Sequence, residues 1–492
     1  MGWNWRKSSR PVDGSDQGSG EIFFFLGGQN AQETTKKLQD LCYESLQHEI
    51  EGLQLSIGFQ GEKGQKPFVL FHWTEAEQIL LERRWVWTQA IKHVHALLDF
   101  HKITLFIDGS SASLEQRILC EDLYSLLGHG KSKEKKIEQI EVCSLQAYDD
   151  AWLKSQENRF QYRLGFADWI NESPDTMTSI AIGQHLQAFA AKHGCGFEAL
   201  DEARLKEQRM NLLLSVGAAS ESSPPRCYVL THKIDGKTPP LMLVGKGITF
   251  DTGGINVKPF EGHVNAMRND MGGASMMSHL FMALVEAGYA GPLVLVIPTC
   301  ENAISGKSMK PGSLIQSRKG HEVFVEHTDA EGRLILADAL DYGESLFSPR
   351  LTLVAATLTT AALRQFTNYV TPVYFANEQF QTKLQENAKR CGERFIFWEE
   401  FRPFHRANRS KFGELTNMGR LPHHANIGGG SNIAAHFLKN FVNGSMIHFD
   451  IFASTWNWSG DYPGSGPGAT GAPFNSVFST LMDGGKDLWG YS

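Results

Sequence analysis

Residues 327–333 read His-Thr-Asp-Ala-Glu-Gly-Arg, which places two carboxylates and a guanidinium group within five residues. An apolar, β-prone run at 323–325 precedes it, and the apolar stretch 334–340 after it has the composition of a buried helix. The motif therefore lies where a strand gives way to a helix, a usual place for catalytic groups in α/β proteins. By itself, the spacing of Asp329 and Glu331 is weak evidence for a catalytic site, because charged loop residues most often form a solvated turn.

A second group of charged residues lies upstream, among glycines. Lys246 stands between two glycines after a short apolar run, 241–244, where a lysine would otherwise be expected to reach solvent. Asp251 and Asp270 each lie two positions before a pair of glycines, which allow close backbone approach and positive φ angles. Buried with the two carboxylates of the first stretch, they would repel one another and become protonated without a cation. Two divalent metal ions would remove this repulsion and would activate a water molecule as a nucleophile.

These blocks resemble the leucyl aminopeptidases, the cytosol aminopeptidase family of dinuclear metallopeptidases, whose signature is N-T-D-A-E-G-R. The resemblance covers most of the C-terminal two thirds of the chain, in the blocks 244–258, 267–274, 328–339 and 448–471. Carried over position by position, it implies five metal ligands: Lys246, Asp251, Asp270, Asp329 and Glu331. It also implies that Asp251 and Glu331 bridge the two ions. Lys258 and Arg333 would be catalytic residues that bind no metal.

The resemblance implies an enzyme that removes N-terminal residues from peptides, with a water molecule bridging two divalent ions as the nucleophile. Carboxylate-rich ligation does not distinguish Zn²⁺, Mn²⁺ and Mg²⁺, and for a peptidase Zn²⁺ is the first expectation and Mn²⁺ the second. A lysine ligand must lose its proton, so the two cations would have to lower the pKa of Lys246 strongly. Lys258 would stabilise the negative charge that develops on the substrate. Arg333 would hold a bicarbonate ion that helps to move the proton.

The residues expected to contact the substrate include several departures from the family pattern. The expected substrate-binding set comprises Met267, His327, Thr357, Leu358, Thr360 and Phe452. His327 replaces an asparagine, and it either hydrogen-bonds its own loop or takes a new role in catalysis. Thr360 replaces a glycine, and its branched side chain is expected to narrow the site. Phe452 either enters the pocket for the substrate's first side chain or packs in the core, which leaves the preference for leucine open.

The chain is expected to adopt an α/β fold with two domains after a flexible, Gly- and Ser-rich N-terminus at residues 1–20. Residues 21–158 are expected to form a smaller N-terminal α/β domain with a mixed sheet. Residues 159–492 are expected to form the larger catalytic domain, with a central mixed sheet flanked by helices. The elements expected up to the start of the catalytic domain are strands at 22–26, 67–72, 104–108 and 140–144, an amphipathic stretch at 31–50, and helices at 75–101 and 149–169.

Composition restricts the other interpretations. A formal net charge of -7 makes nucleic-acid binding a poor expectation, and the lysine-rich run 131–136 is interpreted as a solvated loop. The seven cysteines form no Cys-x-x-Cys pair, which favours reduced thiols in the cytoplasm. No apolar run is long enough to span a membrane, and the N-terminus has no secretory signal.

The family resemblance further implies a homohexameric ring acting on peptide substrates. The alternative is a non-enzymatic or DNA-binding protein on the same fold. The complete set of candidate ligands and the acidic balance argue against it.

Overall fold

The computed structural model describes residues 150–259, 263–419 and 429–484, and before residue 150 it describes seven strands and a few helical residues. The chain divides into two compact units, each of which collects segments that are distant in the sequence. The first unit comprises residues 1–157, 388–392 and 459–467, and the second comprises residues 158–387, 393–458 and 468–492.

The first unit contains a seven-stranded mixed sheet with the order β1-β7-β6-β2-β5-β4-β3. Its strands are β1 (Asn4–Lys7), β2 (Glu21–Gly27), β3 (Ser45–Ile50), β4 (Leu53–Gln60), β5 (Lys66–Trp73), β6 (Lys102–Ile107) and β7 (Gln139–Ser144). Five neighbouring strands, from β1 to β5 in this order, run parallel, and β4 and β3 continue the sheet antiparallel. The mixed sheet expected for this part of the chain is confirmed, and β2, β5, β6 and β7 correspond to its four expected strands.

The amphipathic stretch at 31–50 ends in a strand. Residues 45–50 form β3, which pairs antiparallel with β4 so that Ile50 faces Leu53 across two intervening residues. The rest of that stretch, most of the helix expected at 75–101 and the run 131–136 lie outside the described residues.

The second unit is built on a nine-stranded mixed sheet with the order β17-β16-β19-β15-β10-β12-β9-β8, and β11 also pairs with β12. Its strands are β8 (Gly196–Leu200), β9 (Arg226–His232), β10 (Leu241–Gly245), β11 (Gly247–Asp251), β12 (Leu293–Asn302), β15 (Leu351–Ala356), β16 (Thr371–Tyr374), β17 (Phe395–Trp398) and β19 (Met446–Asp450). A three-stranded sheet contains β13 (Leu314–Gln316), β14 (Glu322–Phe324) and β18 (Leu415–Thr416). The expected strands before the two charged motifs correspond to β10 and β14.

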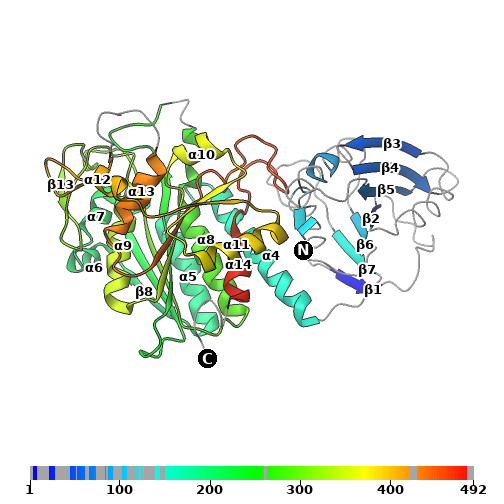
Figure 1. Ribbon diagram of the computed structural model, residues 1–492, viewed down its shortest axis with the longest axis horizontal. Coiled ribbons are helices and arrows are strands. Elements are labelled where there is room, and N and C mark those ends of the chain that lie inside the picture. Colours follow the sequence, from blue (N-terminus) through cyan, green and yellow to red (C-terminus); the bar gives the residue numbers. More distant parts are fainter. Residues whose placement is uncertain are drawn as a thin grey trace. The chain divides into compact units, whose positions relative to one another are not determined.

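Helices cover both faces of the nine-stranded sheet, with α5 and α8 on one side and α7 and α9 on the other (Figure 1). The helices are α4 (Asp150–Asn171), α5 (Ser179–His193), α6 (Glu202–Glu207), α7 (Asn211–Gly217), η2 (Val264–Met271, a 3₁₀ helix), α8 (Gly272–Glu286), α9 (Gly332–Phe347), α10 (Thr360–Phe366), α11 (Glu378–Cys391), α12 (Arg402–Ala407), α13 (Gly430–Lys439) and α14 (Phe474–Asp483). The expected helix at 149–169 corresponds to α4.

Strand β10 shows why the sheet needs cover on both faces. Leu241 and Leu243 belong to the core on the α8 side, whereas Met242 and Val244 belong to the core on the α9 side. Because successive side chains of a strand point to opposite faces, an unbroken apolar strand requires two buried faces. The α/β fold with a helix-flanked mixed sheet is therefore confirmed.

Strand direction determines where the functional loops meet. β10 lies between β12 and β15, and β15 pairs with β19, and all four strands run parallel. Their carboxyl ends consequently reach one edge of the sheet, where ligand sites of α/β proteins form. Lys246, Thr357 and Ile451 are the residues that directly follow three of these strands.

Two further observations bear on the expectations from composition. Within the residues that the structure describes, no helix combines the length and the apolarity needed to cross a membrane. The cysteines whose side chains are described (Cys195, Cys227, Cys300 and Cys391) are free thiols.

Candidate metal centre

The five candidate ligands come from four separate segments and converge at the carboxyl edge of the large sheet. Lys246 follows β10, Asp251 ends β11, and Asp270 lies in η2. Asp329 and Glu331 lie in the connection that leads from β14 into α9. One carboxyl oxygen each of Asp251, Asp329 and Glu331 lies within 4.8 Å of the others. The structure thus assembles residues that are up to 85 positions apart in the chain.

Lys246 is buried between two candidate ligands. Its Nζ lies 2.8 Å from Asp270 Oδ1 and 2.9 Å from Glu331 Oε1, and it donates a hydrogen bond of 2.9 Å to the carbonyl of Thr357. Burial alone would lower the pKa of Lys246, but the neighbouring carboxylates outweigh it and raise the pKa above its usual range. The ammonium group therefore compensates the carboxylates with its own charge. A cation that took its place would have to displace a proton.

Two helices approach Lys246 and the neighbouring strand so closely that glycine is required at the points of contact. A Cβ atom on Gly332 would lie 2.3 Å from Lys246 Cε, and one on Gly273 would lie 2.2 Å from the carbonyl oxygen of Ala355. Any side chain at these positions would separate α9 from Lys246, or α8 from β15. The glycines thus permit contacts between backbone and site that no other residue allows.

Lys258 pairs with the other two carboxylates. Its Nζ lies 2.8 Å from Asp251 Oδ2 and also contacts Asp329 Oδ1. The loop from Thr252 to Lys258 turns back on itself, because the Lys258 N–H bonds the Thr252 carbonyl at 2.9 Å and Gly253 adopts a φ of 89°. Burial alone would lower the pKa of Lys258, but the carboxylates outweigh it and raise the pKa, so its positive charge is retained.

The carboxylates differ in how well their charge is compensated. Burial raises the pKa of Asp270 well above its usual range, and burial with the charges of Asp251 and Glu331 raises the pKa of Asp329 to about 7. Burial would also raise the pKa of Glu331, but Lys246 and Lys258 outweigh it and lower the pKa to about 2. The two ammonium groups alone therefore leave part of the carboxylate charge uncompensated.

The donor set fits divalent cations. Asp270 Oδ2 and Glu331 Oε2 are buried and have no hydrogen-bond partner within the described part of the chain. Buried acceptors without partners cost free energy, and a cation would provide the missing interaction. Carboxylate oxygens with one amine nitrogen are donors that both Zn²⁺ and Mn²⁺ accept.

Further residues hold the candidate ligands in place, and sequence reasoning did not single them out. Asn302 donates from Nδ2 to Asp251 Oδ1 at 2.8 Å and to the Thr328 carbonyl at 3.1 Å. Asn256 and Thr328 exchange two hydrogen bonds of 2.9 Å, Asn256 N–H to Thr328 Oγ1 and Thr328 N–H to Asn256 Oδ1. These contacts join the loop of Lys258 to the loop of Asp329. Asn256 and Thr328 lie inside the two motifs, whereas no local signal marks Asn302.

Arg333 lies in the first turn of α9 and is only 6% exposed. Its Nε has no hydrogen-bond partner among the described residues. Burial lowers the pKa of Arg333 to about 10, so the guanidinium remains charged at neutral pH. A buried guanidinium with an unused donor suits a small planar anion such as bicarbonate.

Three of the residues expected to bind substrate border the centre directly. Met267 lies three positions before Asp270 in the 3₁₀ helix η2, so the two side chains project from the same side. Thr357 donates from Oγ1 to Asp270 Oδ1 at 2.9 Å. His327 Nδ1 accepts the N–H of Asp329 at 3.2 Å, so His327 hydrogen-bonds its own loop.

The other three lie on adjoining segments. Leu358 belongs to the connection between β15 and α10, and Thr360 is the exposed first residue of α10. Phe452 is 5% exposed, and its ring lies 5.2 Å from that of Trp458. Trp458 also donates its Nε1–H to the Phe452 carbonyl at 3.2 Å. Phe452 is therefore fixed in orientation by an aromatic neighbour that sequence reasoning did not assign to it.

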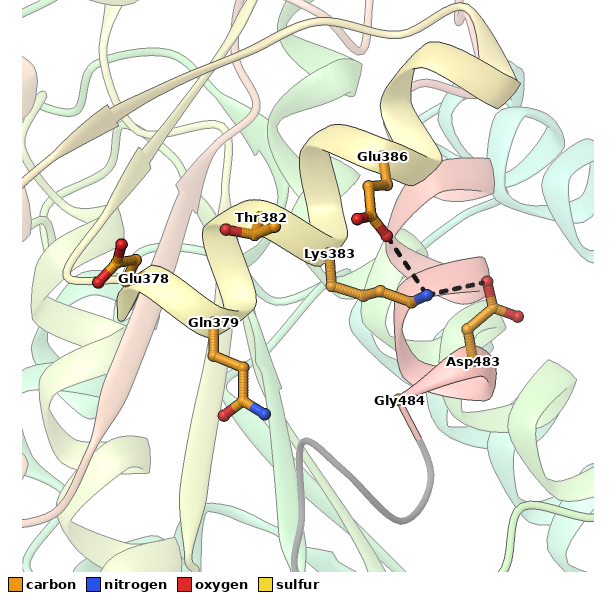
Figure 2. Close-up of a pocket in the computed structure, with 7 residues that line it drawn as sticks. All are labelled: Glu378, Gln379, Thr382, Lys383, Glu386, Asp483 and Gly484. Atoms are coloured by element: carbon orange, nitrogen blue, oxygen red, sulfur yellow. Dashed lines mark hydrogen bonds and ion pairs between the residues drawn. The ribbon is translucent and has the colours of Figure 1, made fainter.

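A hollow of about 450 Å³ lies elsewhere in this unit, over α11 and the end of α14 (Figure 2). Lys383 lies between Glu386 and Asp483, at 3.5 Å and 4.0 Å, and among the described residues it is the one cation in a wall that also carries Glu378 (Figure 2). None of the candidate site residues lines it. The metal centre and this hollow are thus separate features of the unit.

The helix-flanked sheet and the buried cluster of carboxylates and lysines together define an α/β protein with a candidate metal site at the edge of its central sheet. A family model described as the catalytic domain of the cytosol aminopeptidase family matches residues 166–478, and the chain belongs to this family. Membership makes it a metallo-exopeptidase, an aminopeptidase that depends on metal. The resemblance inferred from the motifs is thereby confirmed.

Individual relatives agree with the family assignment. A "Probable cytosol aminopeptidase" from Wolbachia pipientis wMel is 28% identical over 74% of this chain and 73% of its own length. A protein of the same name from Microcystis aeruginosa (strain NIES-843 / IAM M-2473) is 30% identical over 72% of this chain and 70% of its own length. Among solved structures, the "Bottromycin maturation enzyme BotP in complex with Mn" has the same fold, with a TM-score of 0.76 and 21% identity over 95% of this chain and 99% of that chain.

Proposed function

We propose that this aminopeptidase uses two divalent ions, held by Lys246, Asp251, Asp270, Asp329 and Glu331, to remove N-terminal residues from peptides. The observation that carries the proposal is the convergence of carboxyl oxygens from Asp251, Asp329 and Glu331 within 4.8 Å. Unpartnered buried oxygens on Asp270 and Glu331 support it. When bound, the ions would polarise the scissile carbonyl and supply an activated water molecule that bridges them as the nucleophile.

The protein's own residues account for the remaining chemistry. Lys258 keeps its proton and carries a fixed positive charge at the centre, where it stabilises an oxyanion on the substrate. Arg333 remains charged and has an unused buried donor, which supports its role in holding a bicarbonate ion that moves the proton. Met267 and Thr357 border the centre and are proposed to orient the substrate.

A release assay on a panel of aminoacyl amides tests this function. The protein is freed of metal with a chelator, then assayed with added Mn²⁺ or Zn²⁺ on substrates with free and with acetylated amino groups. We expect activity only with metal and only on a free amine, together with about two metal ions per chain. Equal cleavage of the acetylated substrates, or activity that survives chelation, would exclude this mechanism.

Assembly and location are part of the same proposal. The resemblance supports a homohexameric ring, and the names of the relatives support a cytoplasmic location. The substrates are peptides, and nucleic acid is not proposed as a partner because the chain carries a net charge of -7.

A further inference from the structure

Asp450 ends strand β19 at the edge of the sheet that carries the metal centre, and its side chain is fully buried. β19 pairs with β15 so that Asp450 lies opposite Ala356. The residue after Ala356 is Thr357, which starts the connection to α10. A buried carboxylate is costly unless hydrogen bonds replace its lost hydration. Its hydrogen-bond partners therefore indicate why an aspartate occupies this position.

The carboxylate accepts hydrogen bonds from four neutral donors. Oδ1 accepts the N–H of Leu358 at 3.3 Å and that of Phe452 at 3.4 Å. Oδ2 accepts the hydroxyl of Thr359 at 2.8 Å and the hydroxyl of Ser431. Tyr374 donates to Ser431 Oγ at 2.8 Å, which leaves the Ser431 proton for Asp450. The aspartate thus ties α13, β19 and the β15–α10 connection together.

The connection that Asp450 holds is the one that touches the metal centre. The Thr357 carbonyl accepts the hydrogen bond from Lys246, and the Thr357 hydroxyl bonds Asp270. Leu358 follows Thr357 directly, so a bond to its N–H fixes the backbone beside two candidate ligands. Through its second N–H partner, the same carboxylate fixes Phe452. Asp450 is therefore the common anchor of two segments that carry residues expected to bind the substrate.

We propose that Asp450 is a positioning residue for substrate recognition, which sets the 357–360 segment and Phe452 at the spacing that a peptide's first residue requires. This inference rests on the proposed function and deepens it. Asp450 makes no contact with the candidate metal ligands among the hydrogen bonds and ion pairs of the described residues. Its loss is therefore expected to weaken substrate binding while the metals are retained.

Three variants test the inference: Asp450→Ala, Asp450→Asn and the matched control Asp338→Asn. Asp338 is also fully buried and accepts backbone N–H groups, from Leu212, Leu213 and Arg318, but it touches none of the candidate site residues. We expect Asp450→Ala to keep its metal and to raise KM roughly ten- to a hundredfold with a smaller change in kcat. Asp450→Asn keeps an oxygen that can accept from the two N–H groups, so its KM should lie close to that of the unmodified protein. Asp338→Asn should lower the melting temperature and leave KM unchanged.

Hydrogen–deuterium exchange of the 357–360 segment provides a readout that does not depend on activity. Exchange should be faster in Asp450→Ala than in the unmodified protein and unchanged in Asp338→Asn. If the unmodified protein released no amino acid, the proposed function would fail, whereas the exchange result would still decide the role of Asp450. If Asp450→Ala does not fold, Ser431→Ala, which removes one hydrogen-bond donor to Asp450, takes its place in the comparison. Unchanged KM and unchanged exchange in folded Asp450→Ala, or in its replacement Ser431→Ala, would overturn the inference.

Discussion

Lys246 and Lys258 are chemically identical but occupy different positions among the four carboxylates. Lys246 Nζ reaches Asp270 and Glu331 and is enclosed by the backbone of Thr357, whereas Lys258 Nζ reaches Asp251 and Asp329 from a loop. An enclosed amine can become a ligand when a cation takes its place. An amine at the end of a loop can act on the substrate instead.

The first prediction separates the two lysines. Lys258→Ala should retain metal and lose turnover by about 10²- to 10³-fold, because its charge is needed only as the oxyanion forms. Lys246→Ala should lose metal as well as turnover. Metal analysis beside steady-state kinetics on both purified variants measures this difference. If Lys258→Ala lost metal and Lys246→Ala did not, the two assignments would be reversed.

The second prediction concerns Phe452. If its ring lines the pocket for the substrate's first side chain, Phe452→Ala should raise activity on leucyl substrates more than on alanyl substrates. Relief of such overpacking amounts to about 1 to 3 kcal/mol, or roughly ten- to a hundredfold in relative turnover. The ring contact with Trp458 also predicts a loss of stability in Phe452→Ala. Trp458→Phe should show the same loss of stability without the change in the ratio of leucyl to alanyl activity. An unchanged Leu to Ala ratio in a metal-loaded protein would assign Phe452 to packing alone.

At the scale of elements, the close contact of α8 with the sheet requires a glycine at position 273. A Cβ on Gly273 would lie 2.2 Å from the Ala355 carbonyl oxygen and 2.7 Å from the backbone nitrogen of Lys246. The third prediction is that Gly273→Ala moves α8 away from β15, lowers the free energy of unfolding by about 1 to 3 kcal/mol and impairs activity. Gly306→Ala is the control, because a Cβ there would meet nothing within 4 Å. Denaturant unfolding and activity of both variants test it, and equal stability would show that α8 tolerates the methyl group.

Helix α13 contains a buried histidine whose two ring nitrogens are both used in the neutral form. His436 Nε2 accepts the N–H of Phe401 at 2.9 Å, and Nδ1 donates to the Asn432 carbonyl at 2.7 Å. Burial, with the neighbouring His405, lowers the pKa of His436 to about 4. An unfolded chain binds this proton with a pKa of about 6.5. The folded state therefore disfavours protonation of His436.

The fourth prediction follows from that difference in pKa. The contribution of neutral His436 is complete above about pH 7 and is lost as the pH falls through 6.5 toward 4, because only the unfolded chain then gains a proton readily. By pH 5 the loss should amount to roughly 2 kcal/mol. His436→Gln should show a shallower decline of melting temperature between pH 7 and pH 5. Parallel pH profiles of the two proteins would contradict this account.

At the scale of the whole molecule, the solved-structure likeness spans 95% of the chain and therefore includes both compact units. The same fold accommodates different sequences, since only 21% of the residues are identical over that span. The fold by itself consequently does not determine the function, which has to be argued from the site residues.

The fifth prediction concerns assembly. We expect a closed ring of six chains, so native mass spectrometry should report six times the 54.8 kDa of one chain. Activity per chain should then fall on dilution if assembly supports the site. A stable, fully active monomer would exclude the hexamer as a requirement for function.

The sequence by itself determined the candidate ligands, the strands that precede them and the α/β class. Each of these features is local: Lys246 follows an apolar strand, and Asp329 and Glu331 share a seven-residue motif. Such local features can be inferred from the sequence because the side-chain periodicity of strands and helices extends over only a few residues.

Only the tertiary structure decided which residues hold the ligands in place. Asn302 bonds Asp251 across 51 positions, and Asp450 bonds Leu358 across 92 positions. Such contacts depend on the order of strands in the sheet, with β19 beside β15 and β12 beside β10 and β11. No repeating pattern in a single sequence relates residues so far apart. Which strands become neighbours depends on burying both faces of the whole sheet at once. The candidate ligands could therefore be predicted from the sequence, and the framework that positions them became visible only in the fold.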